Sequence, residues 1–453
     1  MKEKLPMLSK EQLDEVGKEL LPVESLRETL ELNDKGNPKA TLSNVVRILK
    51  EDPFFIGAIR LNEFTGRIDV VRDLGWKRED DTLDDTDMAY ISLYIEENYG
   101  ISYNSALEKA ISIVANENRY HPIRDILNSL VWDGKPRLEN ILTHFYGVEK
   151  TELVTESLKI FLLGAVSRVF SPGCKFEIFI CLVGDQGIGK STFFRFLAIK
   201  DEWFSDDLRR LDDEKIVVKL QSHWLIEMPE MLTMLTSRNV EDIKTFISRQ
   251  KDTYRTPYAR HPKDPKRQCV FGGTSNKLEV LPMDKSGNRR IIPIETHADK
   301  AEVHILDDEE YSRNYILQVW AEVMEIYRSG NFSLTLPKHL DAELAKYQQR
   351  FTPEDNDQEA IEFFLSNTHE KYVCVKMLAY EALGYSQYDQ LKKSDSNKIS
   401  EIMHHNPDWE AVGTRTVSKY GRVRAWRRKK DIDYISDDGF IEVTEQMEIP
   451  FNN

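Results

Sequence analysis

The sequence lacks the features that would place the chain in a membrane or build it around disulfides or zinc. Its 453 residues include only four cysteines, which are scattered with no metal-ligand spacing. Cys181 and Cys269 lie in apolar runs, so we expect them to be reduced core residues. No apolar run approaches the roughly 18–20 residues that span a bilayer. The first residues contain no apolar secretory segment, so we expect a cytoplasmic protein.

Positive charge is also in deficit. The 77 acidic residues exceed the 62 lysines and arginines, which leaves a net charge of −15. This excludes a protein that coats nucleic acid with its whole surface, because that binding depends on neutralising phosphates. It does not exclude a local basic channel, since charges act mainly within about a Debye length. Hydrophobic content of 40% and charged content of 31% are typical of a globular protein.

The length and the pattern of apolar residues predict four domains or segments. They are a small α+β N-terminal domain, a helical connector, an α/β motor domain and a C-terminal domain of helices plus a hairpin, at residues 1–110, 111–168, 169–350 and 358–453. In the predicted motor domain, strand-like runs alternate with helical or irregular segments. The four runs are residues 176–183, 223–227, 268–273 and 290–294. This alternation predicts a mostly parallel sheet with helices on its faces.

The most specific motif is a glycine loop between an apolar strand-like run and a helix-like run. Its glycines let backbone N–H groups surround phosphates, and the N-terminus of the following helix adds partial positive charge. A chance turn is the alternative, but the flanking strand and helix favour a site for ATP. Lys190 is predicted to reach the β- and γ-phosphates, and Ser191 to ligate Mg²⁺. The nucleotide-binding residues are Gly184, Asp185, Gln186, Gly187, Ile188, Gly189, Lys190, Ser191 and Thr192.

Two glutamates follow the next apolar strand. A phosphate-binding loop needs one acid at a neighbouring strand end to hold the Mg²⁺ shell and a carboxylate to polarise the attacking water. Glu227 fits the first role and Glu230 the second, although the division of labour between them stays open. Solvated glutamates at a strand end are the alternative.

Further along the chain, a polar amide and two arginines complete the predicted site. Asn276 ends an apolar strand where it could bond the γ-phosphate or the water. Arg289 and Arg290 precede a strand, and one of them could act as a finger in a neighbouring subunit's site. A surface salt bridge is the alternative, and the sequence does not choose between the two arginines.

Two basic segments are candidates for DNA contact. Tyrosines alternate with basic residues in residues 251–267, as suits phosphate contact and base stacking. Residues 397–405 read as a helix, and a basic hairpin follows, an arrangement that resembles a winged helix. Solvated basic faces are the alternative, and Trp426 could belong to the core. The DNA-binding candidates are Arg255, Tyr258, Arg260, Lys263, Lys266, Arg415, Lys419, Arg422, Arg424 and Arg427.

The order of these motifs resembles superfamily 3 helicases and related AAA+ ATPases, and more closely the virulence-associated protein E family of phages and mobile genetic islands. The likeness is carried by the loop together with residues 132–137, 224–230, 254–258 and 284–290. It implies a ring-forming, DNA-dependent ATPase, taken as a hexamer, that acts in replication of a mobile element beside a primase. Lys190 and Ser191 would then be Walker A residues, Glu227 and Glu230 the Walker B acids, and Asn276 sensor 1. The N-terminal segment is too short and too poor in acid and histidine clusters for a primase site.

The function that follows is an ATP- and Mg²⁺-dependent DNA helicase or translocase acting on single-stranded or forked DNA. A sequence-specific replication initiator that uses ATP only as an assembly switch is the alternative. A small-molecule kinase fits poorly, because kinases need an acceptor pocket and lid arginines. No sequence feature suggests a membrane partner.

Overall fold

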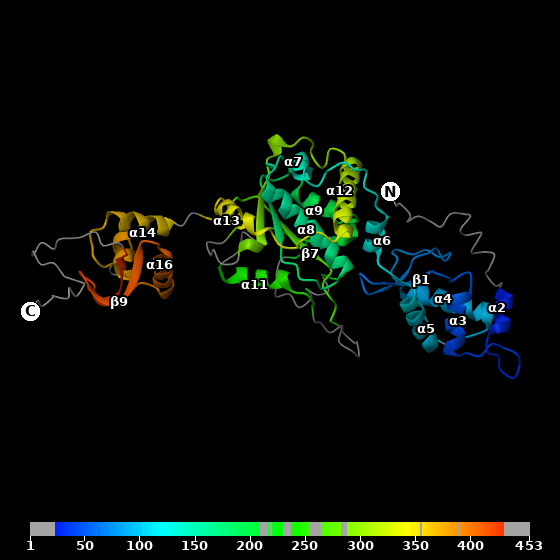
Figure 1. Cartoon of the computed structure of the whole chain (residues 1–453). Helices are drawn as coiled ribbons and strands as arrows, with labels where there is room; N and C mark the ends of the chain where they lie inside the picture. The colour runs from blue at the N-terminus through cyan, green and yellow to red at the C-terminus, as the bar shows by residue number, and fades with distance from the viewer. Residues whose placement is uncertain are drawn as a thin grey trace, which may run out of the picture. The chain divides into compact units, whose positions relative to one another are not determined.

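The computed structural model describes residues 23–102, 104–208, 216, 220–229, 237–252, 264–281, 288–353, 356–386 and 390–429 (Figure 1). The chain divides into two compact units, Met1–Pro353 and Glu354–Asn453. All four cysteines are free thiols, and Cys181 and Cys269 are buried, as predicted. Among the helices described, none combines the length and the apolar character needed to cross a bilayer.

The first unit begins with helices around a small sheet of order β2-β1-β3. Apolar faces of these helices share one core with the sheet. The turn at Phe64–Arg67 joins the antiparallel strands β1 and β2. The elements are α2 (Val23–Thr29), α3 (Leu42–Glu51), β1 (Ile59–Asn62), β2 (Ile68–Val70), α4 (Asp85–Tyr99), α5 (Asn104–Glu117) and β3 (Arg119–Tyr120).

Three helices lead from this region into the larger sheet: α6 (Pro122–Ser129), α7 (Ile141–Tyr146) and α8 (Glu152–Phe170). The turn at residues 132–137 lies between α6 and α7 and is tied to helix α12 (Glu309–Ser329). The Asp133 N–H donates to Gln318, and the Arg137 N–H donates to Glu322. These two hydrogen bonds therefore hold the turn, and with it the helical connector, against α12.

A five-stranded parallel sheet of order β5-β6-β7-β4-β8 forms the centre of the first unit. The four predicted strands are present. A fifth, β5, is too short for any periodicity to show in the sequence. The strands are β4 (Phe179–Val183), β5 (Phe204–Ser205), β6 (Leu225–Pro229), β7 (Val270–Ser275) and β8 (Ile291–Glu295). The molecule is thus a mixed α/β protein built on a parallel sheet.

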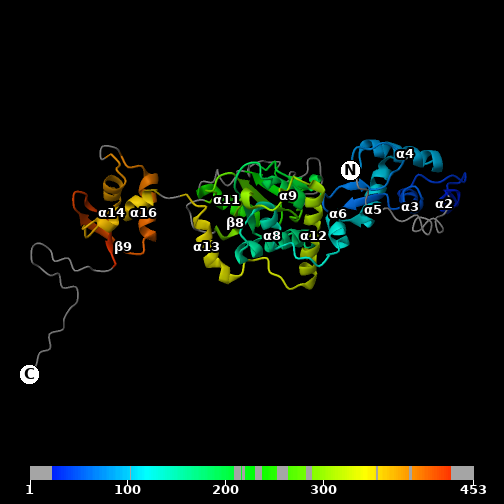
Figure 2. The same ribbon diagram turned by 90° about the horizontal axis from the view of Figure 1, so that it is seen from above.

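Helices cover both faces of this sheet, which explains why β4 is buried along its whole length. Ile180 and Leu182 pack toward α8, α12 and α9 (Lys190–Leu197), whereas Cys181 faces the core that contains α11 (Ser237–Ser248). Figures 1 and 2 show α11 on the side of the sheet away from α12. The remaining elements of the unit are α13 (Asp341–Gln349) and the 3₁₀ turns η1 (Asp201–Trp203), η3 (Asn288–Arg290), η4 (Ala298–Lys300) and η5 (Lys338–Leu340).

The second unit contains helices followed by an antiparallel hairpin. Its elements are α14 (Asn356–Asn367), α15 (Val375–Met377), the π-helical turn η6 (Leu378–Ala382), α16 (Lys393–His405), β9 (Trp409–Val417) and β10 (Gly421–Arg428). Helix α16 begins four residues before the predicted start. Val373 forms an isolated antiparallel bridge with Trp426. Trp426 is only 5% exposed, so it is a core residue and not a stacking platform.

A buried histidine links the connector to the large sheet. The Nδ1 atom of His121 accepts a hydrogen bond from the Arg124 N–H at the start of α6, and its Nε2 lies 2.8 Å from the Gln268 side-chain oxygen. Because Nδ1 accepts, Nε2 carries the proton and donates. Burial, and secondarily the Arg124 charge, lower the pKa of His121. The neutral ring is therefore the one that fits the folded state.

This predicts a loss of stability in mild acid. The folded-state pKa lies below the ordinary value of about 6.5, so the contribution is complete above pH ~6.5 and is lost as pH falls toward the folded-state pKa. Each unit of difference is worth about 1.4 kcal/mol. Chemical denaturation at pH 7.5 and 5.5 measures the effect. The His121→Asn variant can still cap α6 but does not titrate, so its stability should change less over this range.

Candidate nucleotide-binding site

The glycine loop, residues 184–189, connects β4 to α9 at the carboxyl end of the sheet. Gly189 caps α9 with φ of +82°, and a Cβ there would lie 2.5 Å from Cγ2 of Ile305. A Cβ on Gly184 would lie 2.1 Å from Oγ1 of Thr296. Gly189 therefore excludes larger residues through its backbone conformation and through lack of space, whereas Gly184 excludes them through lack of space alone. The loop backbone and the start of α9 are placed to receive an anion.

Lys190 lies at the first position of α9 with its ammonium group turned back to the loop. Its Nζ donates to the carbonyl oxygens of Gly184 (2.8 Å) and Asp185 (2.6 Å) and to Oδ1 of Asn276 (3.0 Å). The residue is 6% exposed, and this burial lowers its pKa. The predicted lysine and the predicted amide thus meet, although 86 positions separate them in the chain.

Glu227 in β6 is fully buried beside the loop. Its Oε1 accepts hydrogen bonds from Ser191 Oγ (2.8 Å) and Thr274 Oγ1 (2.5 Å), and burial raises its pKa. Its Oε2 is also buried and has no hydrogen-bond partner within the described part of the chain. A buried carboxylate oxygen without a partner is costly unless something binds it.

These oxygens fit a magnesium ion. Mg²⁺ is commonly held by one or two carboxylates together with substrate phosphates and water. Ser191 and Glu227 supply a hydroxyl and a carboxylate next to the loop. The described residues contain no group of three or more histidine, cysteine, aspartate or glutamate side chains that could hold a metal.

The predicted arginines lie at the opposite end of the sheet. Strand β8 is parallel to β4, and Ile291, directly after the arginines, pairs with Phe179 at the start of β4. The five residues of β4 extend about 16 Å, so neither arginine reaches the loop of its own chain. Arg290 donates from Nε to Glu177 at 3.0 Å. Arg289 is exposed and has no ion pair with the described part of the chain.

Some predicted residues cannot be placed beside these. Glu230 lies outside the described residues, as do Arg255, Tyr258, Arg260 and Lys263 of the basic segment. Lys266, at the end of that segment, is exposed.

The basic hairpin of the second unit divides into two groups. Arg427 is paired with Glu410 at 2.7 Å, and Lys419 lies 3.8 Å from Glu381. Three arginines are exposed and have no ion pair within the described part of this unit: Arg415, Arg422 and Arg424. The register pairs Arg422 with Thr416 and Arg424 with Thr414, so these two arginines share one face of the hairpin.

Three contacts at the loop were missed from the sequence. Thr274 holds Glu227, as described above. The Tyr146 hydroxyl donates to the Gly189 carbonyl at 2.8 Å, and His304 Nε2 lies 3.4 Å from the Gly187 carbonyl. Thr274 could have been found, since it precedes the predicted Asn276 by two residues. Nothing in the sequence around Tyr146 or His304 signals a contact with a loop some 40 or more than 100 positions away.

The protein is therefore an α/β protein with a parallel sheet. A glycine loop lies at one edge of this sheet, together with an acidic and an amide side chain. The model of the virulence-associated protein E-like domain family matches residues 127–353, half of the chain. The chain belongs to this family, as the sequence motifs predicted.

Solved structures with a similar chain include the apo structure of the NrS-1 C-terminal region, with 14% identity and a TM-score of 0.46, covering 82% of this chain and 95% of that one. An A form apo structure of the same region has 15% identity and a TM-score of 0.44, covering 82% and 96%. A search of curated proteins found no match.

The contacts of Glu227 predict how two variants differ. Glu227→Gln keeps an oxygen for Ser191 and Thr274 but removes the charge, so we expect affinity for ATP with Mg²⁺ to fall at least 10-fold and affinity for ATP with EDTA to stay the same. Titration of a fluorescent ATP analogue measures both. Because no charge remains buried, the melting temperature should not fall. Thr274→Ser keeps the hydroxyl and is the matched control. An equal loss with and without Mg²⁺ would contradict the metal role.

Proposed function

We propose that this chain is an ATP- and Mg²⁺-dependent DNA translocase or helicase that acts in replication of a phage or mobile genetic element. The observation that carries the proposal is the meeting of Lys190, Ser191, Glu227 and Asn276 at the carboxyl edge of one parallel sheet, where one buried oxygen of Glu227 has no hydrogen-bond partner among the described residues. Membership of the virulence-associated protein E-like family supports the same reading.

Each residue has a part in binding and orienting the nucleotide. Lys190 would exchange its carbonyl partners for phosphate oxygens, and backbone N–H groups of the loop would surround them. Ser191 and Glu227 would hold Mg²⁺, which neutralises developing charge on the phosphates. Asn276, already 3.0 Å from Lys190, would bond the γ-phosphate or the attacking water. Positioning of that water is assigned to Glu230.

The sheet order supports an AAA+ or superfamily 3 helicase-like motor. In β5-β6-β7-β4-β8 the loop-bearing strand lies between the amide-bearing strand and the strand that follows the arginines. Because Arg289 lies at the far end of the sheet from its own loop, it would serve a neighbouring copy. The proposed assembly is therefore a closed ring, taken as a hexamer, in which each site lies between two subunits.

The second unit supports DNA contact. Its elements follow the order of a winged helix. A first helix is followed by the bridge residue Val373, by further helices and then by the β9–β10 hairpin. Helix α16 would lie in a groove, and the hairpin would contact phosphates through Arg415, Arg422 and Arg424. Arg427 is assigned a structural role instead, because Glu410 neutralises it.

The test is hydrolysis with and without single-stranded DNA. We expect turnover to rise at least 10-fold with a single-stranded oligonucleotide, since the strand completes the assembly, and a forked duplex to be unwound with ATP. Phosphate release and a fluorescent strand-separation assay measure the two. Turnover that ignores DNA, together with an intact fork, would contradict the proposal.

The alternative function is a replication initiator that binds a specific sequence and uses ATP to switch its assembly state. The three exposed hairpin arginines, which have no ion pair within the described part of their unit, favour it, because they belong to a different unit from the ATP site. Tight, site-selective duplex binding that survives Lys190→Ala, without unwinding, would select this alternative.

A further inference from the structure

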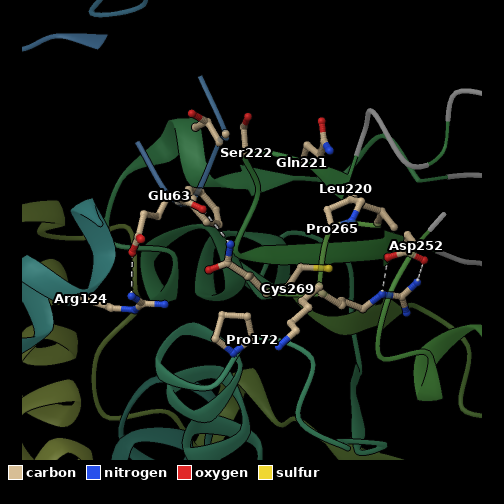
Figure 3. A pocket seen from close by; sticks show the side chains of 15 residues that line it. Glu63, Arg124, Pro172, Leu220, Gln221, Ser222, Asp252, Pro265 and Cys269 are labelled. Carbon is tan, nitrogen blue, oxygen red and sulfur yellow. Dashed lines mark hydrogen bonds and ion pairs between the residues drawn. The ribbon is translucent and has the colours of Figure 1, made fainter. Parts of the chain in front are cut away.

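A cavity of about 380 Å³ lies in the first unit, away from the nucleotide-binding site. The β1–β2 turn at residues 63–66 borders it, as do the segments that lead into β6 and β7 at residues 220–222 and 265–269. Figure 3 shows Leu220, Gln221 and Ser222 along one side and Pro172 opposite. Because these segments precede parallel strands, the cavity lies at the opposite end of the sheet from Lys190. Nothing proposed for ATP uses it.

The side chains that line the cavity include one more cation than the described carboxylates neutralise. Arg124 is paired with Glu63 at 3.0 Å, and Arg267 forms a buried double contact with Asp252 (Figure 3). Lys266 also lines the cavity, is exposed and has no ion pair within the described residues. Two carboxylates are therefore matched by two arginines, and Lys266 remains available to an anion.

Ser222 is the second observation that points to a ligand. It has φ of +72°, the left-handed conformation that is costly for a residue other than glycine and is concentrated at binding sites. Its Oγ is buried and has no hydrogen-bond partner among the described residues. A strained backbone that holds an unsatisfied hydroxyl at a cavity wall is explained if a ligand bonds that hydroxyl.

The remaining walls combine apolar side chains with the polar side chains of Thr65, Gln221 and Gln268. Pro172, Pro265 and Leu220 line the cavity together with Cys269. Binding pockets for small molecules usually measure roughly 300–1,000 Å³, so this one holds a small occupant with an apolar body, one anionic group and a hydrogen-bonding edge. A single nucleotide has all three.

We propose that the cavity binds one nucleotide of the single-stranded DNA on which the motor acts. Lys266 contacts its phosphate, the Ser222 hydroxyl bonds an edge of its base, and the base packs on the prolines. The strand is the source because Asp252 and Pro265 lie on either side of residues 253–263, which the sequence predicts to contact DNA. The inference rests on the proposed function and adds a contact point for its substrate.

The first test changes Lys266. Binding of a fluorescent oligo-dT to the full chain, with Mg²⁺ and a non-hydrolysable ATP analogue, is followed by anisotropy across a series of salt concentrations. Loss of one phosphate contact lowers the slope of log affinity against log salt by about 0.7 for a single strand. Lys266→Ala should show this change. Lys338→Ala, which removes another exposed lysine with no ion pair in the described chain, should not.

The second test separates binding from folding at Ser222. Ser222→Gly removes the hydroxyl and also relieves the left-handed strain. We expect the melting temperature to stay the same or rise while oligonucleotide affinity falls roughly 3- to 10-fold, the value of one hydrogen bond. A residue with only a structural role would leave affinity unchanged.

Three outcomes would overturn the proposal, and they are distinguishable. If both variants kept the affinity and the salt slope of the unchanged protein, the proposed cavity contact would be refuted. The proposed motor function would not be affected by that result. Failure of the unchanged protein to bind oligo-dT would remove the proposed function as well. Binding of dTMP that depends on Lys266, with no effect of either variant on oligo-dT, would assign the cavity to a free nucleotide instead of the strand.

Discussion

Replacing Lys190 by alanine is expected to lower ATP turnover by a factor on the order of 10²–10³, the cost of removing one preorganised charge-stabilising donor. The ammonium group is held at the loop by two carbonyl oxygens and Asn276, so its removal takes away the positive charge that faces the predicted phosphate site. Nucleotide affinity should fall as well, because the lysine contacts phosphates before and during the reaction. Steady-state phosphate release and titration of a fluorescent ATP analogue measure the two effects.

A matched control exists just beyond the same helix. Within the described part of the chain, the Lys200 side chain contacts Glu202 and the Trp203 ring, so Lys200→Ala removes a lysine near α9 without touching the loop. Its turnover should remain within a factor of about two of the unchanged protein, as for a surface substitution. Equal losses in the two variants would mean that the lysine at the loop has no special part in hydrolysis.

Replacing Arg289 by alanine is expected to lower turnover by roughly 10³- to 10⁵-fold, the range for a finger that counters transition-state charge. Arg290→Ala should have a smaller effect, since Arg290 is already held by Glu177 at 3.0 Å. Nucleotide affinity should change little in Arg289→Ala, because the contact forms mainly as charge develops. Comparison of kcat with the affinity of the analogue separates the two roles.

Mixing two inactive variants tests whether the arginine acts on a neighbouring subunit. In a ring with random composition, equal amounts of Lys190→Ala and Arg289→Ala chains place an intact lysine opposite an intact arginine at about one site in four. Turnover should then return in the mixture although each variant alone is inactive. A mixture no more active than its parts would indicate that the arginine serves its own chain or no site at all. Full turnover by a monomer would contradict the ring.

Much of the candidate site was predictable because it depends on local sequence. A tight loop around phosphates needs glycines at set positions, and a parallel strand delivers the residue after it to a known edge of the sheet. The predicted strands at 176–183, 223–227 and 268–273 all formed, so Lys190, Glu227 and Asn276 had to approach one another once the sheet order was right. Family membership was predictable for the same reason.

Contacts between distant segments were not predictable. Whether Arg289 or Arg290 is unpaired depends on Glu177, which lies more than 100 positions earlier. Whether Arg427 faces DNA or a carboxylate depends on its partner across the hairpin, Glu410. The sequence around Trp426 allowed either a core or a stacking role, and burial against the helices of its unit decided for the core.

The sequence by itself determined the α/β class, the glycine loop and the family, because each follows from residues close together in the chain. Only the tertiary structure decided that Glu227 keeps one buried oxygen without a partner within the described residues, that Thr274 and Ser191 hold the other, and that Ser222 borders a cavity. The physical reason is that hydrogen-bond satisfaction and burial depend on which distant side chains fill the space around an atom, and no local pattern encodes that.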